Sequence, residues 1–177
     1  DFVERVKEEI KRIVERLKRL VKEHEDEVKR ILDELRKLVE THKELSKDSL
    51  RKLEEVGDGS EDDIRRLLEE NKKMDKEVND KVRKLAKDVR DIDRRMNERV
   101  ERLLREIEKT LEDLRRENKV DERVLEELRR LVKEVKERAD RSSEKLNELL
   151  RKAEEDAKRS SEENNRRLEE VERRVRK

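Results

Sequence analysis

The chain has 177 residues, of which 59% are Asp, Glu, Lys or Arg and only 29% are apolar. This composition excludes a compact globule with a wide core, and an excess of Glu, Lys, Arg and Leu is typical of long helices or coiled coils. Lys and Arg (53 residues) nearly balance Asp and Glu (52 residues), so the mixed surface charge does not favour a nucleic-acid or membrane partner.

Several other classes of protein are excluded by what the sequence lacks. It contains no cysteine, which excludes a disulfide framework and thiolate chemistry. No stretch approaches the roughly 20 apolar residues that cross a bilayer, and no signal peptide is recognisable. We therefore expect a soluble chain whose localisation the sequence does not specify.

The first interruption of helix-forming sequence is at residues 56–63. Gly57 suits the left-handed residue that ends a helix, and Ser60 suits the N-cap of the next one. At the start of the chain, Asp1 and Glu4 have the spacing of a capping box. These signals predict that a first helix ends and a second begins within this segment.

The second interruption is at residues 117–122. Asn118 can take the left-handed conformation and Asp121 can cap the next helix. Val120 and Leu125 have the spacing of a hydrophobic staple. Because the chain has no proline, no other position is expected to break a helix.

The chain is therefore predicted to form three helices, at about 2–56, 61–117 and 121–176. Each has roughly 55 residues and a length of about 80 Å at 1.5 Å per residue. The linkers are too short to join parallel neighbours, so the helices are predicted to run up, down and up. We expect one domain over residues 1–177.

Core positions recur every eighteen residues along each predicted helix, and we call this spacing the core period. His24 and His42 are one core period apart. The row in the first helix consists of Val6, Ile10, Ile13, Leu17, Leu20, His24, Val28, Ile31, Leu35, Leu38 and His42. Eighteen residues in five turns match a straight helix, whereas a heptad repeat would impose a supercoil. The predicted fold is thus all-α, an elongated, nearly untwisted antiparallel three-helix bundle.

The whole chain resembles de novo designed, parametrically generated helical bundles with buried hydrogen-bond networks. The features that carry this resemblance are the matched helix lengths, the regular core period, the Gly57–Ser60 loop, the Glu/Lys/Arg surface and the lack of Cys, Trp, Tyr and Pro. The resemblance implies a structural scaffold without a natural biochemical activity, a cofactor or a small-molecule substrate.

Polar residues interrupt the apolar rows at matching depths of the three helices. Since all helices rise equally per residue, folding about the first loop places His42 opposite Asp75 and His24 opposite Asp93. The predicted polar network comprises a first layer of His24, Asp93, Asn97, Ser142 and Ser143, a second layer of His42, Asp75, Asn79, Ser160, Ser161 and Asn164, and a patch of Ser46, Ser49 and Asn71 beside the second layer. Asn147 and Asn165 lie at the same depths.

These layers are predicted to fix the register of the helices. A buried polar group without a partner costs about 1–3 kcal/mol, so a slipped arrangement that separates the groups is penalised. The alternative is that the same residues face water at the edge of the bundle without specific pairing.

Metal binding and catalysis agree less well with these residues than a structural role does. A metal site needs three or four converging ligands, and each layer offers one His and one Asp. A Ser-His-Asp triad is nominally present in both layers, but catalysis also needs a substrate cleft and an oxyanion hole. We expect no enzyme activity.

Two alternatives to a passive scaffold stay open. Because histidine titrates near neutrality, the chain could be a pH-responsive module, and the sequence leaves the sign of the response open. Neutral imidazoles would make acid destabilising, whereas His–Asp ion pairs would weaken as the pH rises. The apolar rows could also associate between chains, giving self-association or a helical partner in place of the expected monomer.

Overall fold

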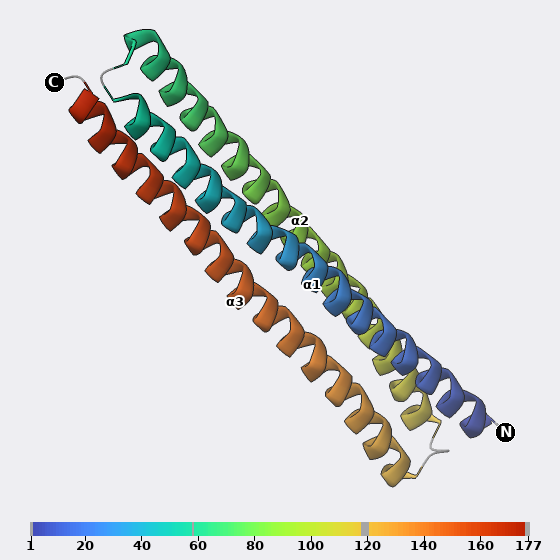
Figure 1. Ribbon diagram of the computed structural model, residues 1–177. Coiled ribbons are helices and arrows are strands. Elements are labelled where there is room, and N and C mark those ends of the chain that lie inside the picture. Colours follow the sequence, from blue (N-terminus) through green and yellow to red (C-terminus); the bar gives the residue numbers. More distant parts are fainter. Residues whose placement is uncertain (1, 58, 118–120, 176–177) are drawn as a thin grey trace. The chain divides into compact units, whose positions relative to one another are not determined.

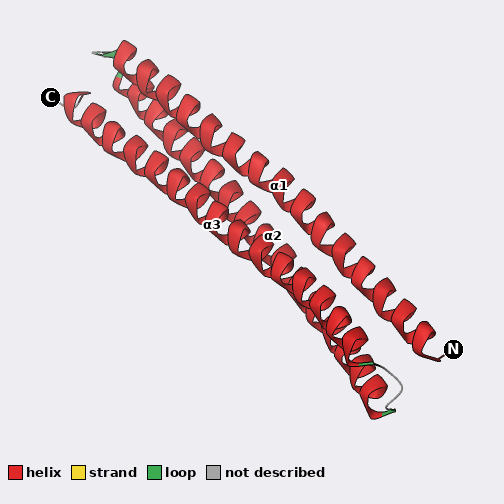
Figure 2. Cartoon of the chain, turned by 90° about the horizontal axis from the view of Figure 1, so that it is seen from below, coloured by secondary structure: helices red, strands yellow, loops and turns green. Residues whose placement is uncertain are grey.

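The computed structural model describes residues 2–57, 59–117 and 121–175, which form three α-helices and no strand (Figure 2). Helix α1 spans Phe2–Val56, α2 spans Glu61–Arg116 and α3 spans Glu122–Val175. The predicted all-α, three-helix fold is therefore confirmed, and the predicted helix ends differ from the observed ones by one residue at most.

The loop between α1 and α2 has the geometry that its glycines indicate. Gly57 has a φ of 49°, the left-handed conformation that L residues with a side chain rarely adopt. The Gly59 N–H donates a hydrogen bond of 2.8 Å to the Val56 carbonyl oxygen. The Ser60 carbonyl then accepts from the Ile64 N–H at 3.1 Å, which opens α2.

The start of α3 is capped by Asp121, as predicted. Its carboxylate oxygen Oδ1 accepts a hydrogen bond of 3.4 Å from the Arg123 N–H, and its carbonyl accepts from the Val124 N–H at 3.0 Å. Both contacts satisfy donors of the first helical turn. The predicted roles of Asn118, Val120 and Asp1 concern residues outside the described part of the chain.

The chain divides into two compact units, each built from parts of all three helices. Unit 1 consists of Asp1–Lys29 and Val89–Asn147, and unit 2 consists of Arg30–Asp88 and Glu148–Lys177. Within each unit, α2 runs opposite to α1 and α3, as the colour gradients of Figure 1 show. The single domain, the elongated shape and the absence of a supercoil stay predictions.

The predicted core row of α1 is buried in both units, apart from Leu20 and Leu38, which are half-buried. In unit 1 the row packs in a cluster with side chains such as Ile107 and Leu114. In unit 2, Leu53 belongs to a second cluster with residues of α2 and α3. Each fully buried aliphatic side chain contributes about 1.5–3 kcal/mol to folding, so these clusters hold the helices together.

Replacing Gly57 tests the loop geometry. We expect Gly57→Ala to lower the free energy of unfolding by about 1 kcal/mol, because alanine is strained at positive φ. Gly57→Asn should cost less, since asparagine tolerates the left-handed region. Urea denaturation of the two variants measures this order. Equal stability of all three proteins would contradict the role of the glycine.

Candidate functional site

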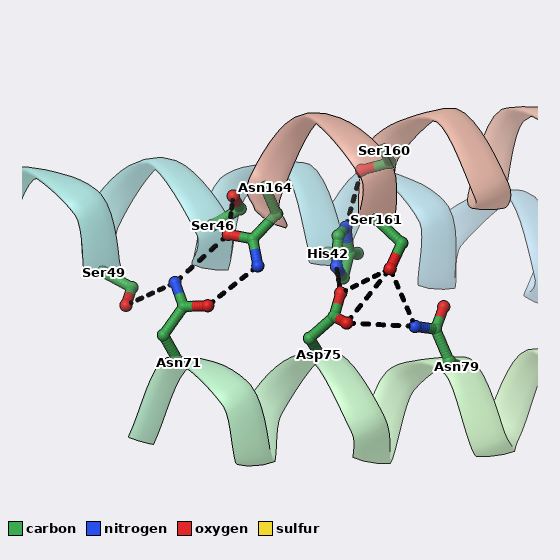
Figure 3. Close-up of polar contacts among 9 residues, drawn as sticks. All are labelled: His42, Ser46, Ser49, Asn71, Asp75, Asn79, Ser160, Ser161 and Asn164. Carbon is green, nitrogen blue, oxygen red and sulfur yellow. Dashed lines mark hydrogen bonds and ion pairs between the residues drawn. The ribbon is translucent and has the colours of Figure 1, made fainter. Parts of the chain in front are cut away.

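The tightest polar cluster lies in unit 2 and joins all three helices (Figure 3). We call it network 2; it consists of His42 on α1, Asp75 and Asn79 on α2, and Ser160 and Ser161 on α3. His42 Nε2 lies 2.7 Å from Asp75 Oδ1, and His42 Nδ1 lies 2.6 Å from Ser160 Oγ. His42 is 2% exposed, so both nitrogens of a buried ring have partners.

The carboxylate of Asp75 is held by more than the histidine. The Ser161 hydroxyl is 2.9 and 3.0 Å from its two oxygens, and Asn79 Nδ2 donates to Oδ2 at 3.3 Å. Asn79 Nδ2 also donates to Ser161 Oγ at 3.0 Å. With an ionised carboxylate, which only accepts hydrogen bonds, His42 Nε2 carries the proton that is shared with Asp75. In the neutral ring, His42 Nδ1 then accepts the Ser160 hydroxyl proton.

Unit 1 contains the same set of side chains, one His, one Asp, one Asn and two Ser, and we call this cluster network 1. It consists of His24, Asp93, Asn97, Ser142 and Ser143, each one core period away from its counterpart in network 2. In both networks the histidine and its serine partner are 118 residues apart. The same arrangement of residues on three helices is therefore built twice.

Network 1 is more loosely bonded than network 2. His24 Nδ1 lies 3.4 Å from Ser142 Oγ, and Asn97 Nδ2 lies 3.5 Å from Ser143 Oγ. His24 Nε2 is 3.1 Å from Asp93 Oδ1, yet neither atom has a hydrogen-bond partner of acceptable geometry among the described residues. We regard this contact as an electrostatic one, because the distance suits attraction but the direction does not suit a hydrogen bond. The Ser143 hydroxyl still donates to Asp93 Oδ2 at 2.8 Å.

A third polar group, which we call the amide cluster, lies in unit 2 and consists of Ser46, Ser49, Asn71 and Asn164 (Figure 3). Asn71 and Asn164 bond to each other in both directions, at 3.1 and 2.8 Å. Asn71 Nδ2 also donates to Ser49 Oγ at 2.9 Å, and Ser46 Oγ donates to Asn164 Oδ1 at 2.6 Å. Both asparagines are 1% exposed, so these contacts replace their bonds to water.

Every residue predicted to belong to the polar network makes at least one of these contacts, and one of the predicted groupings needs a correction. The sequence groups Asn164 with His42, but Asn164 bonds to Ser46 and Asn71 instead. The depth estimate was accurate to about one helical turn, and Asn164 lies one turn beyond Ser160. Asn147 and Asn165 are exposed. The register role assigned to the polar network stays a prediction.

The sequence reasoning missed the grooves that border the polar clusters. One groove, of about 390 Å³, lies between α1 and α3 of unit 2 and includes Ser46 and Ser160 in its lining. Another, of about 540 Å³, lies between α2 and α3 of unit 1 and is lined partly by Asn97 and Ser143. The signal of these grooves in the sequence is the alternation of charges at the edges of the apolar rows. This alternation does not give the depth of a groove.

In residues 2–57, 59–117 and 121–175, no three His, Asp or Glu side chains converge as metal ligands. No helix of this part of the chain combines the length and the hydropathy of a membrane span.

Comparison with known proteins gives weak structural similarity alone. No known protein family matches the sequence, and no curated protein resembles it significantly. A solved structure described as a "Computationally designed three helix bundle" is similar with a TM-score of 0.40 and 17% sequence identity. The match covers 98% of this chain and 86% of that one. At such a TM-score it carries no conclusion about this chain.

The shorter hydrogen bonds of network 2 predict that matched variants of the two networks differ in stability. His42→Ala and His24→Ala leave cavities of the same size, so the difference between them reports the hydrogen bonds. We expect His42→Ala to lower the free energy of unfolding by about 1–2 kcal/mol more than His24→Ala, because it removes shorter hydrogen bonds to its partners. Chemical denaturation measures both values. A larger loss for His24→Ala would contradict the assignment of network 2 as the tighter cluster.

The proton positions in network 2 can be tested by ¹⁵N NMR of the histidine rings. We expect His42 to carry its proton on Nε2, bonded to Asp75, and to show slow exchange of that proton with water because the ring is buried. The Nε2 proton of His24 should exchange faster, since its contact to Asp93 is poorly aligned. A proton found only on Nδ1 of His42 would contradict the hydrogen-bond assignment.

Proposed function

We propose that this chain is a designed structural scaffold without a natural biochemical activity, in which the buried polar clusters set helix register. The observation that carries the proposal is the duplicated network, with the same residue types on the same helices at the same 118-residue separation. An enzyme or a binding protein needs only one such cluster of side chains. A cluster that is repeated at the core period is typical of a structural element.

The register function follows from the cost of separating buried polar atoms. When α2 slides by a turn, His42 leaves Asp75, and each polar group that is left without a partner costs about 1–3 kcal/mol. Aliphatic layers tolerate such a slip better, because their contacts are not directional. The polar clusters thus widen the free-energy gap between the aligned bundle and its slipped forms.

The amide cluster removes an ambiguity that the duplicated networks create. A slip by one full core period would bring the histidine of one network to the aspartate of the other, so this pair of residues does not oppose such a slip. The amide cluster has no counterpart at that distance, because the equivalent positions are Val28, Ile31, Val89 and Leu146, which are all buried and apolar. In the slipped form its asparagines would therefore face aliphatic side chains without partners.

The decisive variant exchanges the amide cluster for the chain's own apolar layer: Ser46→Val, Ser49→Ile, Asn71→Val and Asn164→Leu. We expect its resistance to denaturant to be equal or greater, since replacing all partners of a buried polar group is nearly neutral or stabilising. We also expect loss of a single register, seen as several distances between spin labels on α1 and α2 of unit 2. The labelled parent protein serves as the control.

Light scattering on the same pair of proteins gives a second readout. The parent is proposed to be a monomer, and the apolar variant should form larger species, because helices without a fixed register can pair between chains. One narrow distance and a monomeric mass in the variant would show that the amide cluster is not needed for register. A parent that is itself a stable oligomer would favour the alternative of a partner-binding helical module.

A further inference from the structure

Ser160, His42 and Asp75 are arranged as a nucleophile, a base and an orienting carboxylate. Ser160 Oγ is 2.6 Å from His42 Nδ1, and His42 Nε2 is 2.7 Å from Asp75 Oδ1. A histidine whose Nε2 proton is bonded to a carboxylate presents the Nδ1 lone pair to the hydroxyl. This is the relationship by which a general base activates a serine, with the two ring nitrogens exchanged relative to the usual serine-protease order.

Ser160, unlike the buried His42, borders the solvent. It is half-buried and lines the groove of about 390 Å³ between α1 and α3 of unit 2, which is within the range of about 300–1,000 Å³ found for small-molecule sites. His42 lies beneath it in the core (Figure 3). The groove therefore borders Ser160, and His42 lies behind it.

The charges of the groove indicate which ligand it favours. Its charged lining residues are four basic side chains, Lys43, Lys47, Arg159 and Arg167, and two acidic ones, Asp156 and Glu163. The Glu163 carboxylate is 3.1 Å from Arg167, which offsets part of that positive charge. The groove keeps an excess of positive charge and favours an anionic molecule.

We propose that Ser160 is a reactive nucleophile that is acylated by small, anionic, activated aryl esters, with His42 as its general base. This goes beyond the scaffold function and does not depend on it, because either property can be present without the other.

The step forms one bond and breaks one. Ser160 Oγ attacks the ester carbonyl carbon while its proton passes to His42 Nδ1. The bond between the carbonyl carbon and the aryl oxygen then breaks, and the aryl oxide leaves with the electron pair. The products are an ester of Ser160 and a phenol, which takes up the proton that His42 releases.

The helical setting limits the reaction to activated esters. The backbone N–H groups around Ser160 are engaged within α3, so they do not form an oxyanion hole, and such a hole contributes about 10²–10³-fold to acyl transfer. Basic side chains of the groove supply the electrostatic stabilisation that remains. A good leaving group is then required, and amides are expected to be inert.

Network 1 provides a matched control within the same chain. Ser142 and His24 are the counterparts of Ser160 and His42, but Ser142 Oγ is 3.4 Å from His24 Nδ1, and His24 Nε2 is poorly aligned with Asp93. The background reaction is also low, because the chain has no cysteine and no tyrosine and both of its histidines are buried. Lysine side chains are the main competing nucleophiles.

The test is to incubate the full chain near neutral pH with 4-acetoxy-3-nitrobenzoate, an anionic acetyl ester, and to map the acetyl group by peptide mass spectrometry. We expect one acetyl group on Ser160 and none on Ser142. Ser160→Ala should abolish this label, and His42→Asn should slow it by about 10²-fold, the lower end of general-base contributions. Ser142→Ala and His24→Asn should leave the rate unchanged, with circular dichroism confirming that every variant is helical.

The neutral ester 4-nitrophenyl acetate tests the charge of the groove. After correction for hydrolysis in buffer, we expect the anionic ester to react faster, and this preference to fall with added salt and with Lys47→Glu. Labelling of lysines alone, equal labelling of Ser142 and Ser160, or an unchanged Ser160 label in His42→Asn would overturn the proposal. If His42→Asn does not fold, the comparison of Ser160 with Ser142 in the parent protein decides between these outcomes.

Discussion

The contact between His42 and Asp75 shows the constraint on which the core depends. A polar group that leaves water must find a partner in the protein, or folding loses about 1–3 kcal/mol. In unit 2 this requirement is met on three helices at once, because His42 bonds to α2 through one ring nitrogen and to α3 through the other. Side chains from all three helices must therefore reach the same level before both nitrogens of His42 are satisfied.

The two networks show how differently the same residues can satisfy that requirement. They share residue types and spacing, yet the histidine–serine distance is 2.6 Å in one and 3.4 Å in the other. Network 2 has the amide cluster as a neighbour one turn away, whose reciprocal bonds fix α2 and α3 locally. Network 1 has aliphatic neighbours such as Met96 and Ala139, which pack without directional contacts.

Structural and chemical roles use the same atoms in network 2. A serine hydroxyl that donates to a buried imidazole satisfies the imidazole and is at the same time oriented for proton transfer. The difference between a register element and a reactive site lies in access from solvent. Ser160 borders a groove with an excess of basic residues, so under our proposal one cluster combines a satisfied core with a half-buried nucleophile.

The sequence by itself determined the helices, their ends and the level at which polar residues meet. Gly57 and Asp121 specify local backbone geometry, and a constant rise per residue fixes which residues share a depth, as the pairing of His42 with Asp75 illustrates. Only the tertiary structure decided which atoms bond, that Asn164 joins Asn71, and that Ser160 borders a groove. Depth follows from residue number, whereas partner choice depends on helix rotation and side-chain rotamers, which are set by packing against the other two helices.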